Sequence, residues 1–482
     1  MASWPTCRSE FSSTNGILQG CPLSALLLNL IVRVWCTAIE THCPEVLPRA
    51  YADDGNLISS STEHLRVALN WTQRFSEDTG QSLHAKKTKG WSTTPDGRKR
   101  LNRLTIKGHP LKTVLHDRVL GIQQAFSRRR CPSRLDKQQV PCGRVCQRIQ
   151  CLGLPLEVRA CLVGALVINR GLFGCVSDRP SQGSLVALRR KCTTTIWGRG
   201  RQERAPEILY TLLCQGHRAD PLQACAFNTL VNCRRLLARR PELLPLFSAT
   251  WHLRQVPGRQ IEHGPVRAIA LALRDAGWLM SSPTDIILDY ETQETLPLLH
   301  ENNGLIEHRF REALRVKQLR TLARRRPDFA GVEEGIDRTT TMRACSRARG
   351  LWKMRYRQML AGALTTRTRE HRKKRCSSAA CQCCDLQIPE TEPHILWDCP
   401  HPLYGLIRES LRCPLGTLHD LPPCLRLHGI LPAQHGFERP EFVVSDLQAV
   451  LVCLAAARDH MQPEEDLSEV GDFARRVRQR RV

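Results

Sequence analysis

The chain has 482 residues, of which 41% are hydrophobic, so it can form several domains with packed cores, and wholesale disorder is excluded. Its 71 Lys and Arg residues outnumber its 46 Asp and Glu residues and give a formal net charge of +25. An excess of this size favours a polyanionic partner, most commonly nucleic acid; a basic protein without such a partner is the alternative.

The 23 cysteines do not predict a secreted disulfide scaffold, because the chain is long, their number is odd, and the segment Met1–Pro5 does not resemble a signal peptide. Most stand singly in apolar segments, where reduced cysteine behaves as a small buried hydrophobe. The apolar stretch 23–39 contains Asn29 and Arg33 and is short for a membrane span, so a buried helix is predicted. We expect an intracellular protein, nuclear or cytoplasmic, without a membrane partner.

The first 122 residues alternate helix-like and strand-like patterns. Near their start, Gly16–Ser24 reads Gly-Ile-Leu-Gln-Gly-Cys-Pro-Leu-Ser. Its glycines allow backbone to approach a ligand closely, and Gln19 offers both donor and acceptor groups. Pro22 suits the first position of a helix, where its missing N–H costs nothing.

A pair of carboxylates follows in the segment Val46–Ser59, where Asp53-Asp54-Gly55 stands between two short apolar runs. This pattern is typical of a tight hairpin, whose tip would present both acids. Neighbouring residues on a strand point to opposite faces, so only one acid can address a given side. Mg²⁺ characteristically binds through one or two carboxylates plus substrate phosphates. Taken alone, the pattern also fits an ordinary surface turn.

The next segments continue this alternation. A helix is predicted after Ser61, and Gly80 ends it. The stretch Gly80–Thr88 reads Gly-Gln-Ser-Leu-His-Ala-Lys-Lys-Thr. Beyond it, Leu104–Gly108 and Val119–Ile122 are expected to form a pair of short strands around a turn.

In this order, the segments resemble the B, C, D and E motifs of reverse transcriptases from non-LTR (LINE-type) retrotransposons. The resemblance implies the α+β palm of a right-hand polymerase and RNA-templated DNA synthesis from a DNA primer and deoxynucleoside triphosphates. It makes Asp53 a Mg²⁺ ligand with Asp54 as its partner, and Lys87 a proton donor to pyrophosphate; a solvated surface lysine is the alternative. His84 stands where the family usually has Asn. Residues lining the nucleotide and template groove would be Gln19, Gly20, Pro22, Ser24, Tyr51 and Gly121.

One carboxylate of the family is not found in its expected place, because no aspartate precedes Asp53. Two-metal nucleotidyl transfer needs carboxylates from the A and C motifs to clamp two cations roughly 3.5–4 Å apart. We therefore expect an N-terminally truncated enzyme, without fingers and A motif, that is inactive by itself. The alternative is a polymerase-dead nucleic-acid-binding protein with a zinc knuckle.

From about residue 133 onward the pattern is almost wholly helical. A basic cluster just before this point would contact the template–primer backbone, with a solvated basic loop as the alternative: Arg128, Arg129 and Arg130. A helix is predicted over Leu156–Leu172 and is expected to pack through Val158, Leu162, Ala165, Leu166 and Asn169.

A second site is indicated by Cys381-Gln-Cys-Cys384, nine further residues, His394, four residues and Cys399. Cys-x2-Cys with His-x4-Cys supplies four ligands that suit tetrahedral Zn²⁺. The pattern resembles the Cys-Cys-His-Cys knuckle that follows the polymerase in many non-LTR elements. Cys383 and Cys376 remain alternatives to Cys381 as the first ligand.

The expected organisation is thus a palm remnant followed by mostly α-helical parts and a small zinc knuckle. The boundaries are 1–122 for the partial palm, 123–200 for a helical thumb, 201–365 for a helical connector of unassigned chemistry, 366–405 for a basic stretch and the knuckle, and 406–482 for a C-terminal region.

Overall fold

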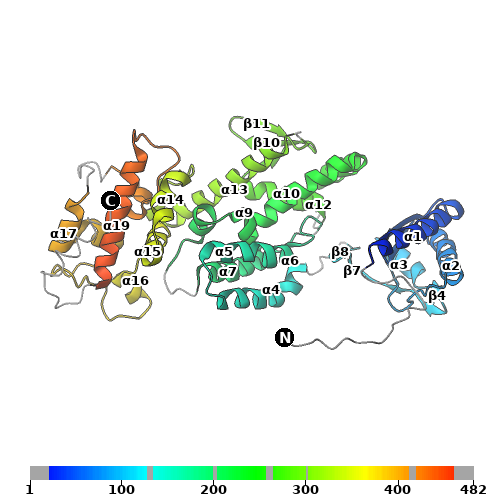
Figure 1. The fold of residues 1–482 in the computed structure, drawn as a ribbon. Coiled ribbons are helices and arrows are strands. Elements are labelled where there is room, and N and C mark those ends of the chain that lie inside the picture. Colours follow the sequence, from blue (N-terminus) through cyan, green and yellow to red (C-terminus); the bar gives the residue numbers. More distant parts are fainter. Residues whose placement is uncertain are drawn as a thin grey trace, which may run out of the picture. The chain divides into compact units, whose positions relative to one another are not determined.

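The computed structural model describes residues 21–127, 134–177, 179–198, 203–256, 264–299, 302–411 and 420–460. The chain divides into two compact units (Figure 1). Unit 1 comprises Met1–Val119 and Gln124–Cys131, and unit 2 comprises Leu120–Gln123 and Pro132–Val482.

Unit 1 mixes helices with short strands. Its elements are α1 (Pro22–His42), β1 (Leu47–Tyr51), β2 (Asp54–Ile58), α2 (Thr62–Asp78), β3 (Lys89–Gly90), α3 (Pro95–Leu101), β4 (Thr105–Ile106), β5 (His109–Pro110), β6 (Lys112–Thr113), β7 (His116–Val119) and β8 (Ile122–Ala125), and the division between the units falls within β8.

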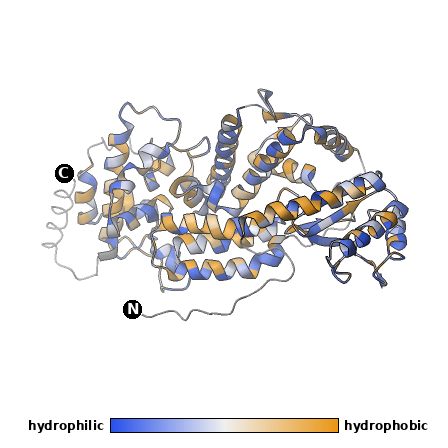
Figure 2. Cartoon of the chain, turned by 45° about the vertical axis from the view of Figure 1, so that its right-hand side comes forward, coloured by the Kyte–Doolittle hydropathy of each residue, from blue (hydrophilic) through white to orange (hydrophobic). Residues whose placement is uncertain are grey.

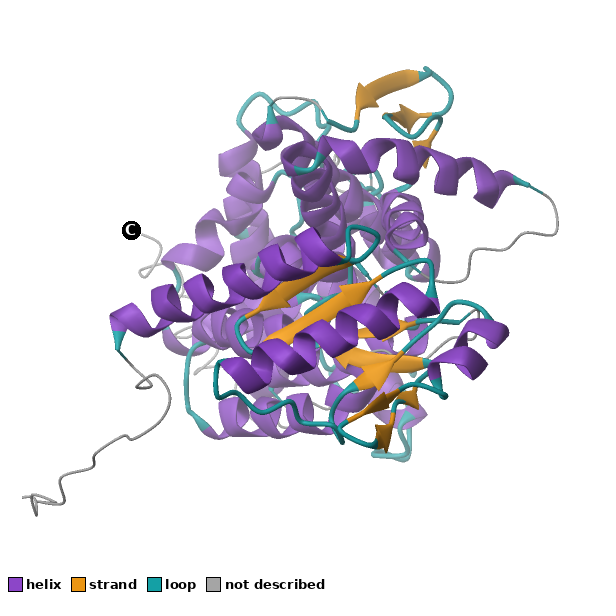
Figure 3. Cartoon of the chain, turned by 90° about the vertical axis from the view of Figure 1, so that its right-hand side faces the viewer, coloured by secondary structure: helices purple, strands orange, loops and turns teal. Residues whose placement is uncertain are grey.

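Helices α1 and α2 lie side by side and pack on one face of the β1–β2 hairpin (Figure 3). Their ends follow from local chemistry. Pro22 stands in the first turn of α1, and the Ser61 hydroxyl caps α2 by accepting hydrogen bonds from two backbone N–H groups. Gly80, with φ +67°, follows the end of α2. The core between helices and hairpin includes Trp35 and Ile39, which are 7% and 0% exposed.

The prediction that 23–39 forms a buried helix is only half right. The helix forms, but five large apolar side chains along one side are 47–60% exposed, namely Leu23, Leu26, Leu27, Leu30 and Val34. Hydrophobic periodicity shows that a face can be buried, but not what covers it. By length and hydropathy Leu23–His42 could cross a membrane, and so could Pro440–Arg458; these windows are 11% and 67% buried within the protein.

The prediction that Leu104–Gly108 pairs with Val119–Ile122 is wrong. Strand β4 pairs with β5, and β7 pairs with β8. Each pair turns at an X-Gly dipeptide, Lys107-Gly108 and Leu120-Gly121, in which both residues have positive φ. Two residues with positive φ make the turn that matches the twist of a hairpin, so each strand pairs with its nearest neighbour in sequence.

Unit 2 is mostly helical. Its helices are α4 (Arg134–Cys151), α5 (Leu156–Leu162), α6 (Asn169–Leu172), α7 (Gln182–Trp197), α8 (Pro206–Ile208), α9 (Gly216–Ala219), α10 (Pro221–Arg239), α11 (Leu244–Gln255), α12 (Pro265–Ala276), α13 (Asn303–Arg325), α14 (Arg338–Arg347), α15 (Gly350–Leu360), α16 (Arg367–Arg372), α17 (Pro402–Glu409), α18 (Pro423–His428) and α19 (Pro440–His460). The described residues of unit 2 also form three π-helical turns, two 3-10 turns and a three-stranded sheet of order β11-β10-β9: η1 (Val163–Ile168), η2 (Leu209–Leu213), η5 (His394–Asp398), η3 (Pro241–Leu243), η4 (Pro327–Phe329), β9 (Leu279–Met280), β10 (Asp285–Asp289) and β11 (Glu294–Pro297).

The described residues of unit 2 form two hydrophobic cores. One combines α10, α11 and α12 with the sheet and the first half of α13. The other contains residues between Leu135 and Ala457 in the sequence, among them Leu396 and Cys399. Hydrophobic and hydrophilic residues mix along most helices (Figure 2), as expected for helices that bury one face. The core from Leu135 to Ala457 contains residues of all four predicted ranges, 123–200, 201–365, 366–405 and 406–482. The boundaries between these ranges therefore remain a prediction.

The predicted face of Leu156–Leu172 is also wrong. The segment forms α5, the π-helical turn η1 and α6 in succession. Val158 and Leu166 are 43% and 49% exposed, whereas Leu156, Val163 and Val167 are buried. The predicted residues and the residues that are actually buried both recur at helical spacing, so the sequence does not decide between the two faces. The π-helical turn also changes which side chains beyond it share a face.

A buried ion pair links three helices of unit 2. Asp220 caps α10 by accepting from the Leu222 N–H at 3.1 Å, and it is completely buried. Its carboxylate lies 3.1 Å from Arg189 Nη2 of α7 and accepts a 2.9 Å hydrogen bond from Gln318 Nε2 of α13. The described residues thus satisfy this carboxylate from three sides.

Candidate functional site

The carboxylate hairpin is formed by β1 and β2, which pair antiparallel with Tyr51 opposite Asp54 and Ala50 opposite Gly55. The two connecting residues are therefore Ala52 and Asp53, and Ala52 adopts φ +53°. The turn lies two residues earlier than the Asp54-Gly55 dipeptide predicted. Gly55 belongs instead to β2, where a Cβ would lie 3.4 Å from the Trp35 ring. Close packing of α1 on the hairpin fixes this register.

Both acids are solvent-exposed at the end of the hairpin. Gly55 and Leu57 face the helices. A Cβ on Gly55 would lie 3.4 Å from the Trp35 ring, and Leu57 packs against the core that contains Trp35. Side chains alternate along a strand, so Asp54 points to the opposite face. Tyr51, directly across from Asp54, is 69% exposed. The carboxylate side of the hairpin is thus the side that α1 and α2 leave uncovered.

The remaining predicted polymerase residues are only partly placed. Pro22 and Ser24 stand in the first turn of α1, and the Ser24 N–H donates to the Cys21 carbonyl at 3.1 Å. Gly121 stands in the β7–β8 turn. Lys87 is exposed, and among the described residues no hydrogen bond or ion pair joins its side chain to Asp53 or Asp54. Five predicted residues lie outside the described residues: Gln19, Gly20, Arg128, Arg129 and Arg130.

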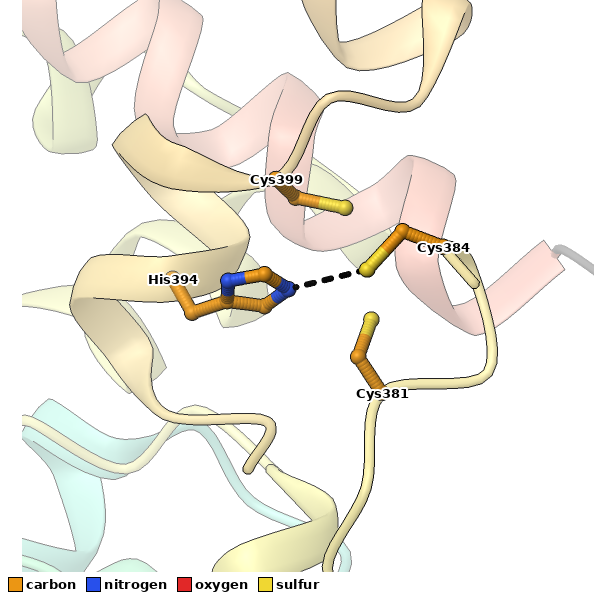
Figure 4. Close-up of side chains that lie close together, drawn as sticks. All are labelled: Cys381, Cys384, His394 and Cys399. Carbon is orange, nitrogen blue, oxygen red and sulfur yellow. Dashed lines mark hydrogen bonds between the residues drawn. The ribbon is translucent and has the colours of Figure 1, made fainter. Parts of the chain in front are cut away.

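Four predicted zinc ligands come together in unit 2. The ligand atoms of Cys381, Cys384, His394 and Cys399, called here the Cys/His cluster, all lie within 4.8 Å of one another (Figure 4). Cys384 Sγ is 3.4 Å from His394 Nε2. Three of the four residues are at most 4% exposed, and Cys384 is half-buried.

A tight loop positions the two thiols at the start of the motif. An isolated β-bridge joins Ala380 to Pro389, and the Cys381 N–H donates to the Ile388 carbonyl at 2.8 Å. Within the loop the Cys383 N–H donates to Cys381 Sγ at 3.4 Å. A backbone donor to sulfur stabilises a thiolate, which is the form that binds metal.

The π-helical turn η5 positions the other two ligands. Thr391 Oγ1 accepts from the His394 N–H at 3.3 Å at the start of the turn. The Cys399 N–H then donates to the His394 carbonyl at 2.7 Å. This five-residue closure brings the two ends of His-x4-Cys to one side, and π-helical turns are common at functional sites.

The two alternative cysteines point elsewhere. Cys383 Sγ lies 3.5 Å from the hydroxyl of Tyr404, and Cys376 Sγ lies 3.2 Å from the carbonyl of Ser378. A second group brings Cys381 and Cys383 near Glu390, but Glu390 already pairs with Arg458 at 2.9 Å. Among the described residues the Cys/His cluster is therefore the better set of four ligands.

Burial shapes the chemistry of these thiols. It raises the pKa of Cys381, as do the neighbouring Cys383 and Cys399 thiols. Burial also raises the pKa of Cys399. A divalent cation reverses this preference, because a coordinating thiol is deprotonated outright. Four protein ligands would leave no open position for a substrate, as in structural rather than catalytic zinc sites.

The sequence analysis missed a group of Asp328, Glu392 and His428, whose ligand atoms also lie within 4.8 Å of one another. Its members come from separate segments, so no local spacing reveals it. Arg326 pairs with Asp328 at 2.6 Å and Arg369 with Glu392 at 2.8 Å. Both carboxylates are thus already balanced by charge, and a cation would have to compete with two arginines.

Comparison with known proteins concerns mainly unit 1. Residues 3–145 match the family described as reverse transcriptase (RNA-dependent DNA polymerase). The match supports a reverse transcriptase domain in the first third of the chain. Such a domain implies a nucleic-acid template and primer as partners and usually a divalent metal. No curated protein matches the chain significantly.

Proposed function

We propose that the chain is part of the reverse transcriptase of a non-LTR retrotransposon and binds an RNA template paired with a DNA primer. The observation that carries the proposal is the β1–β2 hairpin, with Asp53 and Asp54 at its exposed end and α1 packed on its other face. In the sequence, Gln19 and Gly20 lead directly into α1. The family match over 3–145 covers all of these elements.

The hairpin would supply one half of a polymerase metal site. Asp53 would hold Mg²⁺ with Asp54 as its neighbour, and exposed carboxylates suit this hard cation. Bound Mg²⁺ would offset the negative charge of a transferring phosphate. Lys87 would lie near leaving pyrophosphate and donate a proton. No aspartate precedes Asp53 in the sequence, so the second carboxylate clamp is not supplied from there. The polypeptide by itself is expected to add no nucleotides.

The Cys/His cluster would bind one Zn²⁺ as a structural ion. The donors fit, since three cysteines and one histidine form one of the ligand sets of closed tetrahedral zinc sites. The ion would join the loop after Ala380 to η5 and thereby shape a knuckle next to the basic helix α16. Such a knuckle is a second element that could contact nucleic acid.

A polymerase-dead nucleic-acid-binding protein is the second candidate. The observation that favours it is the formal net charge of +25, which suits binding to a phosphate backbone whether or not the hairpin takes part in catalysis. Both candidates require nucleic-acid binding. The two candidate functions differ in whether the β1–β2 hairpin contacts the 3′ end of the primer.

The experiment is titration of the purified chain into a labelled RNA template with a DNA primer at several salt concentrations. Tight binding that weakens steeply with salt is expected, because phosphate neutralisation releases counterions. The same samples, given Mg²⁺ and deoxynucleoside triphosphates, should show no primer extension. Extension that Asp53→Ala abolishes would contradict the expected inactivity, and no binding at low salt would overturn the proposal.

A further inference from the structure

The π-helical turn η5 connects two of the proposed zinc ligands, with His394 at its start and Cys399 directly after its end (Figure 4). Its hydrogen bonds span five residues, a geometry that is rare in proteins and usually occurs as a single turn. Such a turn keeps its shape where neighbouring groups hold it. Two arginines from other helices contact the two ends of η5, Arg369 of α16 and Arg408 of α17.

The carboxyl end of η5 is held by Arg408. Its Nη1 donates to the Trp397 carbonyl, and its Nη2 donates to the carbonyl of Cys399 itself. The last carbonyls of a helical turn have no partners within the turn, and the planar guanidinium group satisfies two of them at once. Movement of the Cys399 backbone away from the cluster would break at least one of these hydrogen bonds.

The amino end of η5 is held by Arg369 through Glu392, which lies two residues before His394 and is 7% exposed. Glu392 Oε2 accepts a hydrogen bond from Arg369 Nη2 at 3.0 Å, and Oε1 lies 2.8 Å from Nη1. Arg369 Nη1 also donates to the carbonyls of Gly362 and Leu364, at 3.0 and 2.7 Å. The guanidinium group therefore joins the start of η5 to the segment that follows α15.

Zinc binding would also place a net charge at this mostly buried site. Three thiolates and one Zn²⁺ carry one negative charge in excess, because a coordinating thiol is deprotonated. A buried charge is costly unless an opposite charge lies nearby. Arg408 donates to two carbonyls, and no ion pair among the described residues joins it to a carboxylate. Its positive charge is thus available to offset the charge of the metal-loaded cluster.

A purely structural role is the simpler alternative for both arginines. In that case they would stabilise the fold equally with and without zinc. Two observations favour a role at the metal site. Arg408 contacts the backbone of a ligand directly, and Arg369 pairs with a residue in the first turn of the segment that carries His394. Each arginine therefore acts on the position of one ligand.

We propose that Arg369 and Arg408 are positioning residues of the zinc site, which hold η5 from its two ends so that His394 and Cys399 are in place before the ion binds. Arg408 also supplies the positive charge that offsets the three thiolates. Ligands that are already in place lose little freedom on binding, so this arrangement raises zinc affinity. The inference rests on the proposed zinc binding by the Cys/His cluster and names residues outside the cluster that set its affinity.

The first test compares the zinc affinity of full-length variants by competition with a chelator. Arg408→Met should bind zinc about 10–100-fold more weakly than wild type, as is typical when a group that supports a metal ligand is lost. Arg408→Lys keeps the charge but loses the planar pair of donors, so its affinity should fall between the two. Arg369→Met should also weaken binding. Arg372→Met is the matched control on the same helix, since Arg372 is 65% exposed and lies 3.5 Å from Glu203, and it should keep wild-type affinity.

Melting temperatures with and without zinc separate positioning from general stabilisation. A group that stabilises only the fold raises both temperatures and leaves the difference between them unchanged. A group that raises zinc affinity also enlarges the difference, because a ligand stabilises the folded state more as its Kd falls. Zinc should therefore raise the melting temperature less in Arg408→Met than in wild type. Equal shifts in these two proteins, or wild-type zinc affinity in both methionine variants, would overturn the inference.

A third measurement uses the wild-type chain alone and does not depend on the folding of a variant. Hydrogen exchange of the metal-free protein is followed by mass spectrometry for the peptide that contains η5. Slow exchange is expected, because the two arginines hold this turn without the ion, and exchange that becomes slow only after zinc is added would contradict the proposed positioning. If wild type binds no zinc, the assignment of the Cys/His cluster fails as well.

Discussion

Substitution of Cys384 by serine tests the Cys/His cluster most sharply, because the chain contains its own control. Cys384 Sγ lies 3.4 Å from His394 Nε2 in the cluster, whereas the adjacent Cys383 Sγ contacts the Tyr404 hydroxyl. The two cysteines are neighbours in the same loop and are both half-buried. Cys384→Ser and Cys383→Ser therefore differ mainly in whether a metal ligand is lost.

The expected loss of zinc affinity in Cys384→Ser follows from the number of ligands. Structural zinc sites contribute roughly 10–16 kcal/mol of apparent binding free energy. Divided equally among the four ligand atoms of the cluster, the loss of one removes about 2.5–4 kcal/mol, or roughly a hundred- to a thousandfold in affinity. Cys383→Ser removes only a weak sulfur–hydroxyl contact, so its zinc affinity should stay within a few-fold of wild type.

The assay measures zinc per chain after purification and again during titration with a competing chelator. Wild type and Cys383→Ser should each hold near one equivalent, and Cys384→Ser should release zinc at a much lower chelator concentration. His394→Ala should behave like Cys384→Ser. Equal zinc content in all variants would refute the assignment, and loss in Cys383→Ser alone would move the site to Cys383.

Two further substitutions test what holds unit 2 together. Asp220→Ala removes the nearer carboxylate of the buried Arg189 and leaves only Glu207, at 3.8 Å, so it should cost roughly 3–5 kcal/mol of stability in denaturant unfolding, whereas Arg320→Ala at an exposed pair should cost no more than about 1 kcal/mol; equal costs would contradict this difference. Burial acts to raise the pKa of Asp328, but hydrogen bonds and charges from His428 and Arg326 outweigh it and hold the pKa well below its usual range. Because the folded pKa lies below the unfolded value of about 3.9, the stabilisation is present above that pH and is lost as pH falls below it. Asp328→Asn should therefore lower the melting temperature at pH 7 and flatten its decline below about pH 4, and a curve parallel to wild type would show that Asp328 does not contribute in this way.

Features fixed by short-range chemistry could be predicted from the sequence. Ser61 caps α2, Gly80 follows its end, and Pro22 stands in the first turn of α1, since each acts through its own backbone or that of its neighbours. The Cys/His cluster belongs to the same class. Its ligands lie within 381–399, so their spacing already restricts how they can meet, although the π-helical turn was not foreseen.

Features that depend on packing between elements distant in the sequence could not be predicted. The hairpin turn lies two residues earlier than expected because Gly55 of β2 packs against Trp35 of α1. The buried face of Leu156–Leu172 was misassigned because two sets of residues had helical spacing. The ion pair of Glu157 with Arg357 joins residues two hundred positions apart in the sequence, and no local pattern marks such a pair.

The position of the primer end tests the central claim most directly, since it does not require catalysis. A primed RNA template carrying a photoreactive nucleotide at the primer 3′ end would be irradiated with the full chain and the linked peptides identified by mass spectrometry. We expect links to the β1–β2 hairpin around Tyr51–Asp54, reduced by Asp53→Ala. Links confined to unit 2, or to no defined segment, would contradict the assignment of this hairpin to a polymerase palm.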